Sequence, residues 1–176
     1  MDGMATLLSG ANPFNDRIGG NVHIPLVGVV PIQDMKGDNP VDTEQLQEMC
    51  AEAKHYLESF DWCKAAEPVY WGGGIGKIFS VLVFEIVGLK ADVDRWLWVV
   101  VGDIPPLYIV LDDCRSPSDV LDKYMELMKQ WIELARQGRT SDDLPPTGAE
   151  PTPEWAALLE KRLQFIRTNI GPLLSK

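Results

Sequence analysis

The strongest pattern in the chain is the β-branched and aromatic stretch over residues 77–113. Two apolar runs, 78–89 and 96–111, are separated by a polar loop. The segment 102–106 (Gly-Asp-Ile-Pro-Pro) interrupts the second run, and its prolines lack the N–H that a strand needs. The pattern predicts a three-stranded antiparallel β-meander. Because both faces of its strands are apolar, we expect both to be covered by other layers.

A register for the last two strands follows if the turn at 102–106 places Val101 opposite Leu107. Side chains alternate across a strand, so this register sorts them into two faces. The aliphatic face carries Leu97, Val99, Val101, Leu107, Ile109 and Leu111, and the aromatic face carries Trp96, Trp98, Val100, Tyr108 and Val110. We expect the aliphatic face to meet the helices. The aromatic face should meet another layer, a partner subunit or a ligand.

Apolar residues recur at helical spacing in three further segments, which predicts three amphipathic helices. These segments span residues 42–60, 116–137 and 153–170. Asp42, with Gln45 three residues later, has the pattern of a capping box at the first helix. Ser116 followed by proline predicts the start of the second helix, and Thr152 followed by proline predicts the start of the third.

These elements predict an α+β fold, in which an antiparallel sheet built on residues 68–112 packs against about three helices. With 176 residues, the chain has the length of one domain. We expect a flexible N-terminal arm over residues 1–21 and a single α+β domain over 22–176. Residues 23–32 should form an edge strand or a strand-like loop, because two of its residues are prolines.

Residues 61–76 are predicted to form a loop, a short strand at Pro68–Trp71 and a flexible turn at Gly72–Gly76. The glycine run invites comparison with a phosphate-binding loop, G-x-x-x-x-G-K-[ST]. Here Trp71 takes the leading position and Ile78 the closing one, and a β-type sequence follows instead of a helix. Nucleotide binding is therefore disfavoured, and the glycines form a turn or allow close backbone approach.

The formal net charge is −10, and no cluster of Lys and Arg is present to replace the counterions of a nucleic acid. We therefore predict no nucleic-acid partner. A basic protein or a cation remains open, although excess acid more often serves solubility. No apolar run reaches the ~20 residues that span a bilayer, and the N-terminus lacks the pattern of a secretory signal. The three cysteines fit no metal or redox spacing, so we expect a cytoplasmic protein without a cofactor or membrane association.

Carboxylates offer two candidate sites. Asp92, Asp94, Asp112 and Asp113 should gather at one end of the meander, with Asp103 at the other. Such clusters can bind hard cations, but Asp at strand ends is also ordinary turn chemistry, and we predict no metal site. Glu85 lies inside an apolar strand, where burial would raise the pKa of its carboxyl and suit a general acid. A structural pair of Glu85 with Arg95 or Lys77 is the favoured interpretation.

Nucleophilic catalysis has little support, and we predict no catalytic residue. The histidines are His23 and His55, and no G-x-S-x-G elbow is present. A pairing of Cys63 with His55 stays open, but the thiols are better explained as structural. The candidate binding surface consists of Trp71, Glu85, Trp96, Trp98, Asp103 and Tyr108. Its aromatics could anchor an interface, line a pocket or fill the core.

The segment 96–110, Trp-Leu-Trp-Val-Val-Val-Gly-Asp-Ile-Pro-Pro-Leu-Tyr-Ile-Val, precedes an acidic turn and the helix that runs from Tyr124 to Trp131. Over residues 70–170 the chain resembles an uncharacterised family of small bacterial proteins, a domain of unknown function with a Trp-Val-Val-Gly-Asp-aliphatic-Pro-Pro core. The resemblance implies a bacterial origin. It implies no activity and no catalytic residues.

Two hypotheses about function follow. The first is a non-enzymatic interaction or accessory protein, which uses the aromatic sheet face or the acidic sheet end against a protein partner or a second copy in a homodimer. The second is a small-molecule-binding protein or hydrolase. Its pocket would lie between Trp71, the Gly72–Gly76 turn and the Gly102–Pro106 turn, with Glu85 or Asp103 as the acid–base group.

Overall fold

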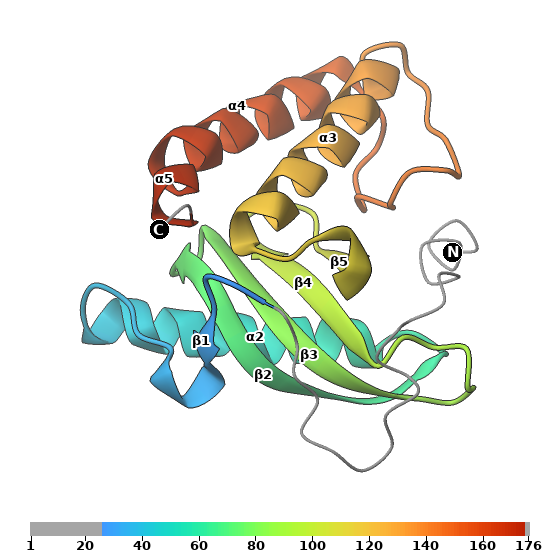
Figure 1. The fold of residues 1–176 in the computed structure, drawn as a ribbon. Helices are drawn as coiled ribbons and strands as arrows, with labels where there is room; N and C mark the ends of the chain where they lie inside the picture. Colours follow the sequence, from blue (N-terminus) through green and yellow to red (C-terminus); the bar gives the residue numbers. More distant parts are fainter. Residues whose placement is uncertain (1–25, 175–176) are drawn as a thin grey trace.

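The computed structural model describes residues 26–174 (Figure 1). The arm predicted over residues 1–21 and the first three residues of the predicted edge segment, 23–25, lie outside the described residues. The described part folds as an antiparallel sheet with helices packed on it. The predicted α+β class is confirmed.

Within residues 26–174 the sheet has five strands in the order β1-β2-β3-β4-β5, and every neighbouring pair is antiparallel. The strands are β1 (Val30–Pro31), β2 (Cys63–Ile75), β3 (Phe79–Gly88), β4 (Trp96–Gly102) and β5 (Leu107–Val110). The predicted meander is therefore confirmed as β3-β4-β5. Of the predicted edge segment, β1 pairs two residues with β2.

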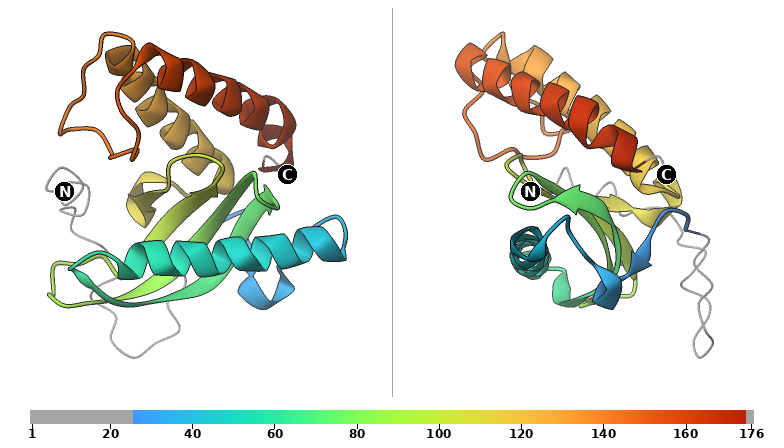
Figure 2. Two further views of the ribbon diagram at one scale, coloured as in Figure 1. Left: turned by 180° about the vertical axis from the view of Figure 1, so that it is seen from behind. Right: turned by 90° about the vertical axis from the view of Figure 1, so that its left-hand side faces the viewer.

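Helices cover both faces of this sheet, as the apolar strands required. They are α2 (Pro40–Glu58), α3 (Pro117–Ala135), α4 (Pro153–Asn169) and the short α5 (Gly171–Leu174), with 3-10 turns η2 (Ile32–Asp34) and η3 (Leu111–Asp113). Helix α2 crosses one face, and α3 and α4 lie side by side on the other side of the sheet (Figures 1 and 2). The strands β3 and β4 are buried along almost their whole length between these layers.

Local capping chemistry begins each long helix. Ser116 and Asp119 form a capping box at α3, and the Thr152 hydroxyl accepts from the Trp155 N–H at α4, both as predicted. At α2 the predicted cap is wrong by three residues: Asn39, not Asp42, is the N-cap, and its side-chain oxygen accepts from the N–H of Asp42 at 2.9 Å. The helix α2 begins at Pro40. Proline is tolerated there because the N–H of the first helical residue has no partner within the helix.

The glycine run is part of a strand. The strand predicted at Pro68–Trp71 is present but is longer than expected, since β2 runs from Cys63 to Ile75 with register shifts after Pro68 and Trp71. The flexible turn predicted at Gly72–Gly76 is therefore wrong. A Cβ at Gly72 would lie 2.7 Å from Cγ of Pro117, and one at Gly74 would lie 2.2 Å from the carbonyl oxygen of Phe79. The glycines therefore allow close packing, which was the alternative interpretation.

The register between β4 and β5 differs by one residue from the prediction. Val100, not Val101, lies opposite Leu107. The reason is the β4–β5 turn: Gly102 still pairs with Phe79 of β3, and the Asp103 N–H donates to the Ile78 carbonyl at 3.1 Å. A Cβ at Gly102 would meet that carbonyl oxygen at 2.2 Å. The last residues of β4 thus pair with β3 and not with β5.

This shift separates the aromatic residues that were expected to share a face. Trp98 lies opposite Ile109, and Val99 lies opposite Tyr108. Because opposed residues point to the same side, Trp98 and Tyr108 lie on different faces. The prediction of one aromatic sheet face is wrong.

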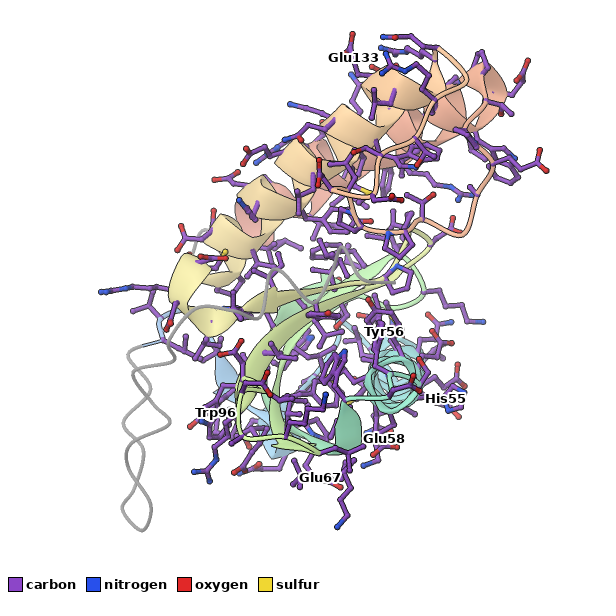
Figure 3. The ribbon with its side chains drawn as sticks, turned by 90° about the vertical axis from the view of Figure 1, so that its right-hand side faces the viewer. His55, Tyr56, Glu58, Glu67, Trp96 and Glu133 are labelled. Carbon is purple, nitrogen blue, oxygen red and sulfur yellow. The ribbon has the colours of Figure 1, made fainter. Side chains whose placement is uncertain are left out.

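Each of the two aromatics joins a different part of the core. The Trp98 indole N–H donates to the Cys114 carbonyl at 2.8 Å, near the start of α3. The Tyr108 ring faces α2, where its centroid lies 5.3 Å from those of Phe60 and Trp62 and 6.4 Å from that of Tyr56. Figure 3 shows Tyr56 and Trp96 on opposite sides of the sheet. Both faces are therefore packed layers of one subunit.

Candidate functional site

Three of the predicted surface aromatics are core residues. Trp96, Trp98 and Tyr108 have exposed fractions of 6%, 0% and 0%. They cannot offer a surface to a partner or a ligand without unfolding the sheet layers. Trp71 is partly buried, and its indole N–H donates to the Ser80 hydroxyl at 3.1 Å. The interpretation that these aromatics fill the core is the one that fits the structure.

Glu85 forms the structural pair that the sequence favoured. Its Oε1 accepts from Nε of Arg95 at 2.8 Å, and the guanidinium of Arg95 also lies 5.7 Å from the centroid of the Trp96 ring. The side chains of Glu85 and Arg95 are 36% and 39% exposed. Glu85 is thus partly exposed and neutralised by Arg95, so the environment of a buried general acid is not present.

Asp103 has a different position from the other candidates. It lies in the β4–β5 turn, and its Oδ2 forms an ion pair with Nε of Arg162 on α4 at 3.3 Å. The pair connects a turn of the sheet with a helix from the C-terminal part of the chain. A pocket lies beside it.

This pocket has a volume of about 510 Å³, and we call it the turn pocket. It lies between the β4–β5 turn, α3, α4 and the loop at 147–150. The lining residues are Gly102, Asp103, Ile104, Pro105, Pro106, Trp131, Thr147, Gly148, Ala149, Glu150, Trp155, Leu159 and Arg162. Figure 2 shows α3 and α4 lying side by side and joined by the long loop that contributes to this site.

Local structure holds the walls of the turn pocket in place. The Tyr124 hydroxyl of α3 donates to the Pro105 carbonyl at 2.7 Å, which ties the turn to the helix. In the loop, Gly148 has φ of +72°, a conformation that glycine adopts without steric cost. The neighbouring Ala149 N–H donates to the Thr147 hydroxyl at 3.3 Å. The segment 147–149 therefore forms a local turn that is held by a hydrogen bond within the loop.

The lining combines an apolar wall with a few charges. Ile104, Trp131 and Leu159 are buried and form the apolar part. Asp103, Glu150 and Arg162 supply two negative charges and one positive charge. An apolar pocket with a small number of convergent polar groups is the usual form of a small-molecule site, and such sites measure roughly 300–1,000 Å³.

A second cavity, of about 550 Å³, lies on the other side of Asp103. It is lined by Gln45, Glu48, Met49, Glu52, Lys77, Ile78, Gly102 and Asp103. Both cavities include residues of the Gly102–Pro106 turn, beside which a pocket was expected. Gly72–Gly74, the other expected boundary, lie within β2 and line neither of these two cavities.

Sequence reasoning missed Trp131, Glu150, Trp155 and Arg162 as site residues. A weak signal was available for two of them, since Trp155 and Arg162 are seven residues apart on one predicted helix and so share a face. Nothing in the sequence placed that face beside Asp103. The approach of α4 to the β4–β5 turn is a property of the tertiary structure.

The cysteines are poor nucleophiles in this fold. Cys50, Cys63 and Cys114 are free and buried. Burial raises the pKa of the Cys50 thiol to about 11 and that of Cys114 to about 12, and it raises the pKa of Cys63 as well. The thiolate is the reactive form, so these residues stay protonated at neutral pH. His55 is exposed on α2, where Figure 3 shows it pointing away from the sheet.

Between residues 26 and 174, no group of three or more His, Cys, Asp or Glu side chains is arranged to hold a metal ion. Over the same residues, no helix combines the length and the apolar character needed to cross a membrane. Comparison with known proteins found no matching family, no similar curated protein and no similar solved structure. The site must therefore be interpreted from its own chemistry.

Proposed function

We propose that this protein binds a small molecule in the turn pocket. The observation that carries the proposal is the ion pair of Asp103 and Arg162 beside a cavity of about 510 Å³ with an apolar wall. Concave sites of this size and composition suit small ligands, whose apolar part is desolvated while a few polar groups fix the orientation. The sheet face expected to serve as an interface is occupied by the protein's own helices.

The polar groups of the turn pocket are available to a ligand. Arg162 carries five N–H donors on its guanidinium, yet it donates no hydrogen bond to any residue between 26 and 174, and its one ion pair there is with Asp103. Its side chain is 38% exposed and that of Asp103 is 64% exposed. Both groups can thus exchange water for a ligand at low cost.

A ligand screen detected at Trp155 tests this proposal. The chain is produced with 5-fluorotryptophan, and the Trp155 resonance in the ¹⁹F spectrum is assigned with a Trp155→Phe variant. A fragment library should contain members that shift the Trp155 and Trp131 resonances and leave Trp98 unchanged, because Trp98 lies in the sheet core. A library that shifts neither pocket resonance would contradict the proposal.

A second candidate function, binding of a protein partner, is favoured by the outer surface of α4. Trp155, Leu158 and Phe165 are 47%, 37% and 48% exposed and lie along one side of the helix. We call them the α4 stripe. Exposed aromatics grouped on one helix face are typical of interaction sites. The stripe adjoins Arg162 and Lys161, so an apolar segment that also carries acidic residues is the proposed partner chemistry.

The two candidates are separated by a pair of variants. Phe165→Ser changes the α4 stripe outside the turn pocket, and Leu159→Ser changes the pocket wall. If the protein acts by binding a partner, Phe165→Ser should abolish that complex and leave the fragment hits unaffected. Self-association through the stripe, the homodimer alternative, is tested by light scattering of both variants.

Membership of the resembling bacterial family and a cytoplasmic location remain predictions.

A further inference from the structure

The charges around the turn pocket are arranged as a neighbouring pair of opposite sign. Nε of Arg162 lies 3.3 Å from Oδ2 of Asp103. Glu150 adds a second carboxylate to the lining. A ligand with only a positive charge would meet the guanidinium, and a ligand with only a negative charge would meet two carboxylates. Because Arg162 and Asp103 are already paired with each other, a ligand of a single charge that bound one of them would displace the other and leave it without a counterpart.

A ligand that carries both charges close together avoids this conflict. The guanidinium of Arg162 is planar and can donate two parallel hydrogen bonds to a carboxylate. The carboxylates of Asp103 and Glu150 can accept from an ammonium group. In an α-amino acid the two charged groups are attached to one carbon, so both can lie beside a guanidinium and a carboxylate that are themselves neighbours.

The rest of the lining specifies what the ligand carries besides its charges. Ile104, Trp131 and Leu159 are buried, and Trp155 is half-exposed at the pocket. Each buried CH₂ of a ligand gains roughly 0.8 kcal/mol when it leaves water. A polar side chain would gain nothing from this wall and would lose its hydration. The wall therefore suits an aliphatic or aromatic side chain.

From these observations we infer that the turn pocket binds the zwitterionic end of an apolar α-amino acid. The inference rests on the proposed function and names its ligand class. The carboxylate is held by Arg162, the ammonium group is held by Asp103 and Glu150, and the apolar side chain contacts Trp131, Trp155 and Leu159. A free amino acid and the amino acid end of a larger metabolite share this chemistry.

Matched ligands test each contact separately. L-leucine and L-phenylalanine present all three features, leucinamide lacks the carboxylate, N-acetyl-leucine lacks the ammonium group, and glycine lacks the apolar side chain. Binding is measured from the Trp155 resonance of the 5-fluorotryptophan-labelled full chain. Leucine should bind about tenfold more tightly than leucinamide and N-acetyl-leucine, because each lost contact to a charged group costs about one order of magnitude. Glycine should bind at least about tenfold more weakly than leucine, because it buries no apolar side chain.

Variants assign the effect to the named residues. Arg162→Gln should weaken leucine binding about tenfold and leave leucinamide binding unchanged. Asp103→Asn should weaken leucine binding and leave N-acetyl-leucine binding unchanged. Arg136→Gln is the control, because Arg136 forms an exposed ion pair with Glu160 on the same pair of helices without lining the pocket. An unshifted Trp98 resonance in each variant establishes that the core is intact.

The failures of the two proposals differ. If leucine and leucinamide bind equally well, or if Arg162→Gln weakens both equally, the amino acid assignment is overturned and the pocket remains a ligand site. If the fragment library binds but no amino acid in the panel does, the assignment is also overturned. If neither the panel nor the library shifts Trp155 or Trp131, the proposed function itself fails.

Discussion

The carboxylate of Asp42 accepts a hydrogen bond from the backbone N–H of Gly76 at 2.6 Å, across 34 residues of sequence. Its other oxygen accepts from the N–H of Asp38 at 2.9 Å. One side chain in the first turn of α2 therefore holds the turn that joins β2 to β3. That turn also supplies the carbonyl of Ile78, which accepts a hydrogen bond from the N–H of Asp103 in the β4–β5 turn.

Replacing Asp42 should destabilise the fold more than its position at a helix start implies. Asp42→Ala leaves two backbone N–H groups without their acceptor, and hydrogen bonds to charged groups contribute about 1.5–3 kcal/mol. We expect a loss of about 2 kcal/mol in the free energy of unfolding, measured by urea titration. Glu44→Ala, an exposed position on the same helix, is the control. Equal effects of both substitutions would contradict the role assigned to Asp42.

Gly72→Ala should be destabilising by overpacking. The added methyl group would lie 2.7 Å from Cγ of Pro117 and 2.9 Å from Cγ1 of Val81. Forcing such contacts into a packed core costs typically about 1–3 kcal/mol. Gly171→Ala is the matched control, because the nearest atom there would be 3.6 Å away. If Gly72→Ala is as stable as Gly171→Ala in thermal unfolding, α3 is not packed on β2 in the way described.

The thiols predict a loss of stability in alkaline solution. The pKa values of Cys50 and Cys114 rise from 9.0 to about 11 and about 12 on folding, through burial. Above pH 9 the unfolded chain therefore releases thiol protons that the folded chain keeps. The unfolded state then binds fewer protons, so stability must fall as the pH rises. This contribution is complete below pH 9 and is lost between about pH 9 and 12.

The measurement is the free energy of unfolding at intervals from pH 8 to 11, compared with that of Cys114→Ser. The serine variant lacks one of these titrating thiols, so its stability should fall less steeply over this range. Identical slopes for the two proteins would exclude Cys114 as a source of the alkaline dependence. Reaction of the native protein with a thiol reagent at neutral pH should be slow and should accelerate in urea.

Glu85→Gln should have only a small effect. Its partner Arg95 is partly exposed, and exposed ion pairs contribute about 0–1 kcal/mol. We expect a loss below about 1 kcal/mol in urea unfolding and no change in the affinity of any ligand for the turn pocket. Arg95→Gln serves as the reciprocal variant. A large loss of ligand binding in Glu85→Gln alone would contradict this purely structural role and indicate a functional one.

Much of the architecture could be predicted because it depends on local chemistry. The caps at Ser116 and Thr152 satisfy helix N–H groups within three residues, so their pattern is visible in the sequence. The antiparallel order of β3, β4 and β5 follows from short turns between apolar runs. The pair of Glu85 with Arg95 was also accessible, because both residues flank the same hairpin.

Other features depended on groups that are distant in the sequence. The glycine run has the composition of a turn. In the structure it continues strand β2, and its glycines pack closely against Pro117 and the carbonyl of Phe79. The register of β5 shifts because Gly102 still pairs with Phe79 and the N–H of Asp103 donates to the carbonyl of Ile78. With that shift, Trp98 and Tyr108 moved to opposite faces and the expected aromatic surface disappeared.

By itself, the sequence determined the three long helices, the antiparallel order of β3, β4 and β5 and the burial of both sheet faces, because hydrophobic periodicity and capping act between near neighbours. Only the tertiary structure decided where a ligand could bind. Asp103 belongs to a sheet turn and Arg162 to the last long helix, and their meeting depends on how α3 and α4 pack against the sheet. That packing is a sum of many weak contacts between distant residues, and no short pattern records it.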